Sequence, residues 1–186
     1  ASKVAAEAIL ARALVQSARK EDPKASAKTI LSRLGQWNEL GYRQELFELL
    51  DQGQQMDLVG VYGDICWLTA QDDSNACHLV SKLALETKVG QIITGTIRAG
   101  QSAYWWFEGR KGQLLALALD GLDDDFDPVL SLRSSGGKEI AENDDFAGTD
   151  ARIPLLYVPE DGRFLIQARD YAHLAGSYAL SVRDLA

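Results

Sequence analysis

The stretch FDPVLSL, residues 126–132, decides the fold that the sequence predicts, together with GGKEIAENDD at 136–145. Apolar residues recur at every second position through Leu130 and Leu132, and two glycines then turn the chain toward a second segment that ends in an acidic Asn-Asp-Asp run. Alternation with a period of two is typical of a strand, and a short glycine-containing connection between two such segments is typical of a hairpin. We therefore expect a β-hairpin with carboxylates at its ends.

Other short segments with the same alternation lie on both sides of this hairpin, separated by turns that glycine or proline marks. They cover about 93–97, 104–107, 115–119, 153–158, 164–168 and 178–182. Seven or eight short strands at such regular spacing are typical of two packed antiparallel sheets. The second half of the chain is therefore predicted to be a β-sandwich of the jelly-roll or immunoglobulin-like kind.

The first half of the chain has the three-and-four spacing of apolar residues that is typical of helices. Five helices are expected, at about 2–21, 23–40, 43–51, 55–70 and 76–83. The period changes near Val89 and Gly90, so the fold class is α+β in two units: an all-helical bundle of hairpins over 1–88 and the β-sandwich over 89–186. Because the junction has neither a proline nor a Ser/Gly run, we expect the two units to be in contact.

A set of short motifs in the second half follows the order and spacing of a known family. The motifs are WWF at 105–107, GQLL at 112–115, DPVL at 127–130, NDD at 143–145, PEDGRF at 159–164 and GSYALSV at 176–182. Over about residues 90–185 the chain therefore resembles the bacterial pre-peptidase C-terminal (PPC) domain, a small β-sandwich appended to many secreted proteases and other exported proteins. The resemblance implies a non-catalytic module for binding or assembly, and it names no ligand. The helical half has only a faint likeness to a tetratricopeptide repeat, at 34–42, without a second copy.

The charge and the absence of apolar runs restrict the class of protein. The formal net charge is −8, and in the second half fifteen Asp and Glu accompany nine Lys and Arg, which disfavours nucleic acid as a partner and favours cations or basic protein surfaces. No run approaches the roughly 20 apolar residues of a membrane-spanning helix, although association with a membrane complex stays open. The chain starts at Ala1 and its one methionine is Met56, which fits an exported protein after signal-peptide cleavage as well as it fits a trimmed chain. We expect a periplasmic or secreted location.

The sequence offers little for catalysis. Its two histidines are His78 and His173, and although His78 adjoins Cys77, neighbouring residues on a helix point about 100° apart. No nucleophile elbow, zinc-protease helix motif or phosphate-binding glycine loop occurs. We therefore expect a protein without enzymatic activity.

Cys66 and Cys77 are the only cysteines. If the helices around them form a hairpin that turns near Asp73, a rise of about 1.5 Å per residue leaves the two cysteines close together along the helix axis. They can form a disulfide if both face the seam between the helices, and an exported compartment favours that bond. Two buried free thiols are the alternative.

Four aromatic residues follow one another at 104–107, and successive residues of a strand face opposite sides of a sheet. The resemblance to the PPC family places Trp105 and Phe107 inward, which leaves Tyr104 and Trp106 on the outside. Large aromatic side chains on the outside of a sheet mark a contact surface. Either the helical unit packs on them or they bind an external partner.

Acidic residues lie at both ends of the predicted hairpin, and antiparallel pairing brings the two groups to the same edge of the sheet. The side chains are Asp124, Asp125, Asp127, Asn143, Asp144 and Asp145. Calcium takes oxygen ligands of this kind, and some collagen-binding relatives of the family bind calcium, so a Ca²⁺ site is one of two interpretations of these residues, and no cofactor is certain. The alternative is that Asp127 caps the turn at 143–145 by accepting backbone N–H groups, because Asp and Asn are ordinary turn residues.

These patterns together predict a non-catalytic exported protein. We expect an accessory subunit or adaptor in an extracytoplasmic complex, docking on a protein or on extracellular matrix through the sandwich, with Tyr104 and Trp106, and through the helical surface. The main alternative is the C-terminal fragment of a secreted hydrolase, a protease, whose sandwich binds substrate or matrix. A sugar-binding module is a third interpretation, based only on the aromatic strand.

Overall fold

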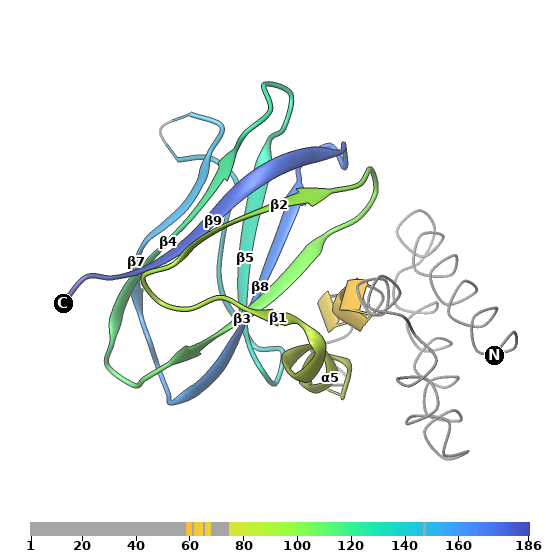
Figure 1. The fold of residues 1–186 in the computed structure, drawn as a ribbon. Coiled ribbons are helices and arrows are strands. Elements are labelled where there is room, and N and C mark those ends of the chain that lie inside the picture. The colour runs from red at the N-terminus through yellow and green to blue at the C-terminus, as the bar shows by residue number, and fades with distance from the viewer. Residues whose placement is uncertain (1–58, 61, 65, 68–74, 147) are drawn as a thin grey trace, which may run out of the picture.

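A β-sandwich with a helical segment on one of its outer faces is the architecture of the described part of the chain (Figure 1). The computed structural model describes residues 59–60, 62–64, 66–67, 75–146 and 148–186. The three helices predicted before residue 52 lie outside the described residues.

The described strands form one sheet in the order β1-β3-β8-β5-β6 and a second sheet in the order β2-β9-β4-β7. The first sheet contains Leu85–Glu86 (β1), Ala103–Gly109 (β3), Gly162–Asp170 (β8), Pro128–Ser134 (β5) and Glu139–Asn143 (β6). The second contains Ile92–Ile97 (β2), Gly176–Asp184 (β9), Leu114–Gly121 (β4) and Ala151–Tyr157 (β7). All neighbouring strands are antiparallel except β1 and β3, which are parallel. The predicted β-sandwich is therefore confirmed.

The hairpin that decides the fold is formed by β5 and β6, which pair antiparallel with one irregularity in register after Leu132. Gly137 turns the chain with a φ of 88°, a conformation that glycine adopts without strain. Its N–H donates to the Ser134 carbonyl. The pairing places the start of β5 beside the end of β6, where the acidic residues lie.

Inward side chains of both sheets form the hydrophobic core. They alternate with outward residues along the strands, as in β4, where Leu115, Leu117 and Leu119 are at most 1% exposed. Phe107 and Phe164 stack with ring centroids 5.5 Å apart. Each fully buried large apolar side chain contributes about 1.5 to 3 kcal/mol, so this core is the main source of stability for the sandwich.

A polar contact within this core explains a glycine in β2. Trp105 Nε1 donates to the Tyr178 hydroxyl at 2.8 Å, and burial raises the pKa of Tyr178. Gly95 lies opposite Tyr178, and a Cβ atom at position 95 would come within 2.5 Å of that hydroxyl. Glycine is required there because it leaves room for the tyrosine.

The described residues contain nine strands, more than the seven or eight expected. The additional strand, β1, lies in the segment that the sequence assigned to the helical unit, and it pairs with β3 opposite Trp105 and Trp106. Both residues of β1 are exposed, and two residues are too few for an alternation to be visible. The first strand of the sandwich thus precedes the boundary predicted at residues 88 and 89.

The described helical residues lie against the outer face of the five-stranded sheet, near β3 and β8 (Figure 1). Residues 59–60, 62–64 and 66–67 are helical, within the helix expected at 55–70, and Asn75–Leu83 (α5) corresponds to the helix expected at 76–83. Lys82 in the last turn of α5 complements the helix dipole. None of the described helices has the length and apolar character needed to cross a bilayer.

Candidate functional site

Two rows of side chains on the outer face of the five-stranded sheet face the helical residues. They are the Tyr104 row, Tyr104–Gln167–Ser131, and the Trp106 row, Trp106–Leu165–Arg133, each crossing β3, β8 and β5 in that order. Alternate residues of a strand share one face, so both rows lie on the side away from the sandwich core. Phe107 belongs to that core and Trp105 packs against it, which is the inward pair that the resemblance implies.

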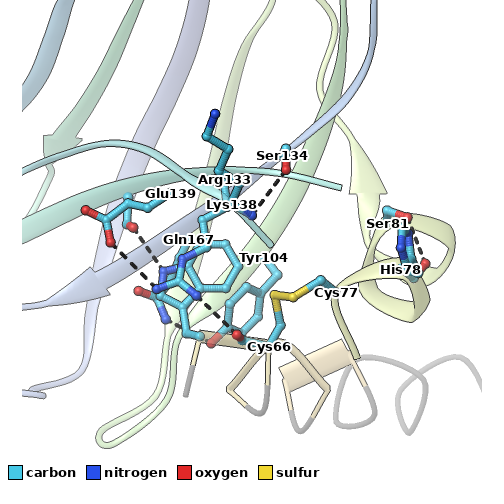
Figure 2. Close-up of a disulfide and its surroundings, with 12 residues drawn as sticks. Cys66, Cys77, His78, Ser81, Tyr104, Arg133, Ser134, Lys138, Glu139 and Gln167 are labelled. Carbon is cyan, nitrogen blue, oxygen red and sulfur yellow. Dashed lines mark hydrogen bonds and ion pairs between the residues drawn. A yellow bond between two sulfur atoms is a disulfide. The ribbon is translucent and has the colours of Figure 1, made fainter. Parts of the chain in front are cut away.

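Tyr104 is the centre of a buried polar network (Figure 2). The residue is 5% exposed, and its ring lies against Trp67 with centroids 5.3 Å apart. The hydroxyl donates to Asp64 Oδ1 at 2.5 Å and accepts from Gln167 Nε2 at 2.9 Å. A Cβ atom at Gly63 would overlap the Tyr104 ring. The helical backbone therefore approaches β3 as closely as a glycine allows.

Arg133 fastens the helical residues around Cys66 to β5 (Figure 2). Its guanidinium lies over the Trp67 ring, 4.7 Å from the centroid, and its Nη1 donates to the Cys66 carbonyl at 3.1 Å. Trp67 Nε1 in turn donates to Ser131 Oγ at 2.9 Å. Burial lowers the pKa of Arg133, while nearby carboxylates, Glu139 first, act in the opposite direction. The group stays charged at any ordinary pH because arginine is so basic.

Arg163 makes the equivalent attachment to α5. Its guanidinium lies 4.0 Å from the Trp106 ring centroid, and its Nη1 donates to the Ser81 carbonyl at 2.8 Å. Trp106 Nε1 donates to the Ala84 carbonyl at 2.9 Å. A guanidinium over an indole ring is attractive by about 0.5 to 2 kcal/mol. Strand arginines and aromatics therefore hold the helical residues at two separate points.

A disulfide joins Cys66, in the helical residues that Arg133 contacts, to Cys77 of α5 (Figure 2). The Cα atoms are 4.7 Å apart, and neither residue is exposed. Both cysteines pack in the same apolar cluster as Val80 and Leu165. The disulfide thus links the helical residues around Cys66 covalently to α5, which we call the closed helical unit. Of the two states that the sequence left open for the cysteines, a disulfide and two free thiols, the structure contains the disulfide.

Tyr104 and Trp106 are covered by helical residues of the chain itself, which is one of the two roles that the sequence leaves open for them. Helical residues bury Tyr104, and Trp106 is half-buried beneath Arg163 and Ala84. Of the two alternatives, packing on the helical unit is the one the structure contains. A surface for a partner has to be sought elsewhere on the molecule.

The acidic residues at the hairpin ends come together only in part. Burial, and after it the charges of Asp145, Asp170 and Asp144, raises the pKa of Asp127. Asp124 and Asp125 are exposed on the preceding loop. Within the described residues, no group of three or more His, Cys, Asp or Glu is arranged to hold a metal ion. Calcium binding therefore stays a prediction from the sequence alone.

Asn143 caps the turn after β6, the role that Asp127 has in the alternative to a calcium site. Its Nδ2 donates to the Asp145 carbonyl at 3.1 Å, and its Oδ1 accepts from the Arg152 N–H at 2.8 Å. Asp127 Oδ1 has no hydrogen-bond partner among the described residues. The cap is therefore corrected to Asn143, whose amide can donate and accept at once.

Asp170, at the end of β8, is a structural residue that sequence reasoning missed. It is fully buried, and its carboxylate accepts the N–H groups of Asp127 at 2.9 Å and of Leu174 at 2.7 Å. Its position between a strand and a turn was the available signal, because Asp in that place commonly binds backbone N–H groups.

Stability should depend on pH through Asp127. Because its pKa is raised in the folded state, the folded protein holds the proton at pH values just above 3.8, where the unfolded chain has lost it. The free energy of unfolding therefore falls as pH rises through that window. Asp127→Asn should remove this contribution, so the melting temperature of the variant relative to the wild type should increase from pH 4 toward neutrality.

Asp125→Asn is the matched control, since Asp125 is exposed on the same loop. Its melting temperature relative to the wild type should follow a flatter pH profile. A difference between Asp127→Asn and the wild type that stays constant across the whole range would contradict a raised pKa.

The histidines lie on separate elements. His78 is exposed on α5, and His173 occupies the turn after β8 with a φ of 62°. Cys77, the neighbour of His78, is bonded to Cys66 and is not available as a thiolate nucleophile.

Four large apolar side chains, which we call the apolar row, are exposed on the outer face of the four-stranded sheet. Leu114 lies opposite Tyr157, and the Leu185 N–H donates to the Leu114 carbonyl at 2.9 Å. Leu155 shares the face of Tyr157, two residues away. The exposed fractions are 38% for Leu114, 64% for Leu155, 62% for Tyr157 and 47% for Leu185. Sequence reasoning missed the row. The available signal was the continuous apolar run Leu155-Leu156-Tyr157, because successive residues of a strand face opposite sides of the sheet and only one side is needed for the core.

Comparison with solved structures found proteins with a partly similar fold. The pre-peptidase C-terminal domain of collagenase from Bacillus anthracis is 15% identical with a TM-score of 0.47, covering 53% of this chain and 93% of that one. PliG from Aeromonas hydrophila, a periplasmic inhibitor of g-type lysozyme, is 14% identical with a TM-score of 0.36, covering 53% and 98%. CorA, a surface-associated copper-binding protein of Methylomicrobium album BG8, is 11% identical with a TM-score of 0.42, covering 53% and 97%.

A scan of known protein families found no match to the sequence, and a comparison with curated proteins found none either. The first structure named above belongs to the family that the sequence resembles. At this identity the likeness concerns the fold of about half the chain and does not establish membership of the family.

Proposed function

We propose that this chain is a non-catalytic binding protein of an extracytoplasmic compartment, an accessory subunit or adaptor that docks on a protein partner through the apolar row. The observation that supports this proposal is the exposure of large apolar side chains next to one another, those of Leu114, Leu155, Tyr157 and Leu185. Contiguous apolar surface of this kind marks interaction sites on soluble domains. An aromatic residue at its middle is suited to contribute most of the binding energy.

The rest of the described structure supports a rigid docking module. Helical residues cover the outer face of the five-stranded sheet, and no described helix packs on the outer face of the four-stranded sheet, where the row lies. The Cys66–Cys77 disulfide fits an oxidising compartment. A rigid surface loses little conformational entropy on binding, which favours affinity.

Tyr157→Ser should weaken partner binding by about tenfold or more, which corresponds to about 1.4 kcal/mol. The tagged chain would be purified under native conditions from its own envelope or secreted fraction, and the affinity of the stoichiometric partner would be measured by calorimetry. Thermal unfolding should change little, because the Tyr157 side chain is already mostly in water.

Tyr171→Ser is the matched control, since Tyr171 is 61% exposed and lies outside the apolar row. It should bind the partner as the wild type does. Equal affinities of the Tyr157 and Tyr171 variants would remove the row from the proposal. Recovery of the chain only as part of a longer polypeptide with protease activity would favour the hydrolase-fragment alternative instead.

A further inference from the structure

β2, Ile92–Ile97, is an edge strand with one side of its backbone unpaired among the described residues. It pairs with β9 through six consecutive residues and is the first strand in the order of its sheet. An edge strand presents a row of N–H and C=O groups to which another strand can bind. Native proteins usually protect such an edge with features that prevent pairing with another chain.

The three other sheet edges carry those features. β7 contains Pro154, which has no N–H to donate, within an irregular part of its register with β4. β6 has an irregular register with β5 and carries the exposed Glu139 and Glu142. β1 is only two residues long. Proline, bulges, charge and short length are the means by which native sheets avoid edge pairing.

β2 has none of these protective features. Its sequence, IITGTI, contains no charge and no proline, and its register with β9 is continuous. Isoleucine and threonine favour strands, and Ile92, Thr94 and Thr96 are exposed, Ile92 by 70%. Gly95 is not an edge-protecting device, because the Tyr178 hydroxyl already requires a glycine there.

Charge indicates what kind of strand fits this edge. Lys88 and Arg98 flank β2 and are exposed, and neither side chain is in an ion pair among those of the described residues. Arg183, also exposed, lies at the end of β9 near the start of β2. The nearby carboxylate of Asp123 accepts the Ser177 N–H on the side of β9 that faces away from β2. Two strand spacings, about 10 Å, separate that side from the open edge of β2. Positive charge therefore flanks an uncharged strand.

We propose that β2 accepts an extended segment of a partner protein as an added edge strand, one with an uncharged β-branched centre and carboxylates at both ends. Backbone hydrogen bonds would supply affinity in this mode of recognition, and Lys88 and Arg98 would select the acidic ends. A second copy of this chain is a poorer occupant. Two-fold antiparallel pairing would bring Arg98 of one copy toward Lys88 of the other, and it would join two chains of net charge −8. The proposal does not depend on the apolar row, which lies on the outer face of the same sheet and includes no residue of β2.

A synthetic peptide with the sequence Asp-Glu-Val-Thr-Val-Thr-Val-Thr-Asp-Glu tests the proposal on the full chain. Saturating peptide should slow hydrogen exchange of amides in 92–97 and leave exchange in β7 unchanged. The same peptide with N-methyl groups on every residue of its Val-Thr centre, which removes the N–H groups of both edges, should bind much more weakly. Absence of protection in 92–97 at saturation would overturn the proposal.

Charge reversal distinguishes electrostatic recognition of the peptide ends from nonspecific binding of the peptide. Lys88→Glu/Arg98→Glu should bind the acidic-ended peptide roughly tenfold more weakly than the wild type, and it should prefer a control peptide with Lys in place of the Asp and Glu. Both substitutions are on exposed side chains, so thermal unfolding should match the wild type. Tyr157→Ser should bind the peptide normally, which keeps this result apart from that of the apolar row. Concentration-dependent dimerisation of the wild type with protection of 92–97 in the absence of peptide would assign the edge to a second copy and overturn the proposal.

Discussion

Replacing Tyr104 by Ala is expected to lower the free energy of unfolding by about 3 kcal/mol and to release the described helical residues from the sheet. Tyr104 is 5% exposed, its ring packs against Trp67, and its hydroxyl joins Asp64 of the helical segment to Gln167 of β8. Truncation removes the packing and both hydrogen bonds at once. Denaturant unfolding gives the free energy, and hydrogen exchange should show α5 losing protection while β4 in the core keeps it.

Tyr104→Phe separates the hydroxyl from the ring. The variant keeps the packing but leaves Asp64 and Gln167 without the tyrosine oxygen, so we expect a smaller loss, about 1 to 2 kcal/mol. If Phe and Ala at 104 destabilise equally, ring packing contributes nothing and the described contact is wrong. If neither variant changes protection of α5, the helical residues do not depend on this contact.

Gly63→Ala tests the close approach of the helical backbone to Tyr104 from the other side. Helix propensity alone predicts that alanine stabilises this helix by about 1 kcal/mol. The Cβ atom would overlap the Tyr104 ring, and overpacking at a buried contact costs about 1 to 3 kcal/mol. The two effects have opposite signs, so we expect a net loss in the wild type. In the Tyr104→Ala background the overlap is gone, and the same substitution should become stabilising.

Features set by local pattern could be predicted from the sequence. The period of two across Leu130 and Leu132 predicted the central hairpin. The alternation along 104–107 divided the aromatics between two opposite faces, and the family resemblance indicated which face is inward. Both rest on neighbouring residues, for which spacing and side-chain direction are directly linked. The helical spacing at 76–83 predicted α5 for the same reason.

Features that depend on distant residues could not be predicted in this way. Arg133 and Arg163 alternate along their strands as solvent-facing residues would, and nothing local indicates that each covers a tryptophan and binds a helical carbonyl 67 or 82 residues away. The Asp170 carboxylate likewise accepts a hydrogen bond from the backbone N–H of Asp127, 43 residues away. Such contacts are set by how the two sheets and the helical segment pack, which a single sequence does not display.

Removing the disulfide by Cys66→Ala/Cys77→Ala should lower the free energy of unfolding by about 2 to 3 kcal/mol. The bond closes a loop over a sequence separation of 11 residues, and closing a short loop restricts the unfolded chain by roughly that amount. The sandwich has its own core, with Phe107 and Leu119 at 0% exposure, so it should stay folded in the variant. Hydrogen exchange in α5 should increase strongly while exchange in β4 and β9 stays near that of the wild type.

The disulfide and the Tyr104 contact should be coupled, because both act on the same helical unit. Once either is removed, the unit detaches more readily and the other has less left to stabilise. The double-mutant cycle of Tyr104→Ala with Cys66→Ala/Cys77→Ala should therefore show a combined loss smaller than the sum of the two, by about 1 kcal/mol or more. Leu119→Ala, in the sandwich core, is the control and should be additive with the cysteine change. Additivity of the Tyr104 and cysteine changes would mean that they act on separate units, and the description of one closed helical unit held on the sheet would be wrong.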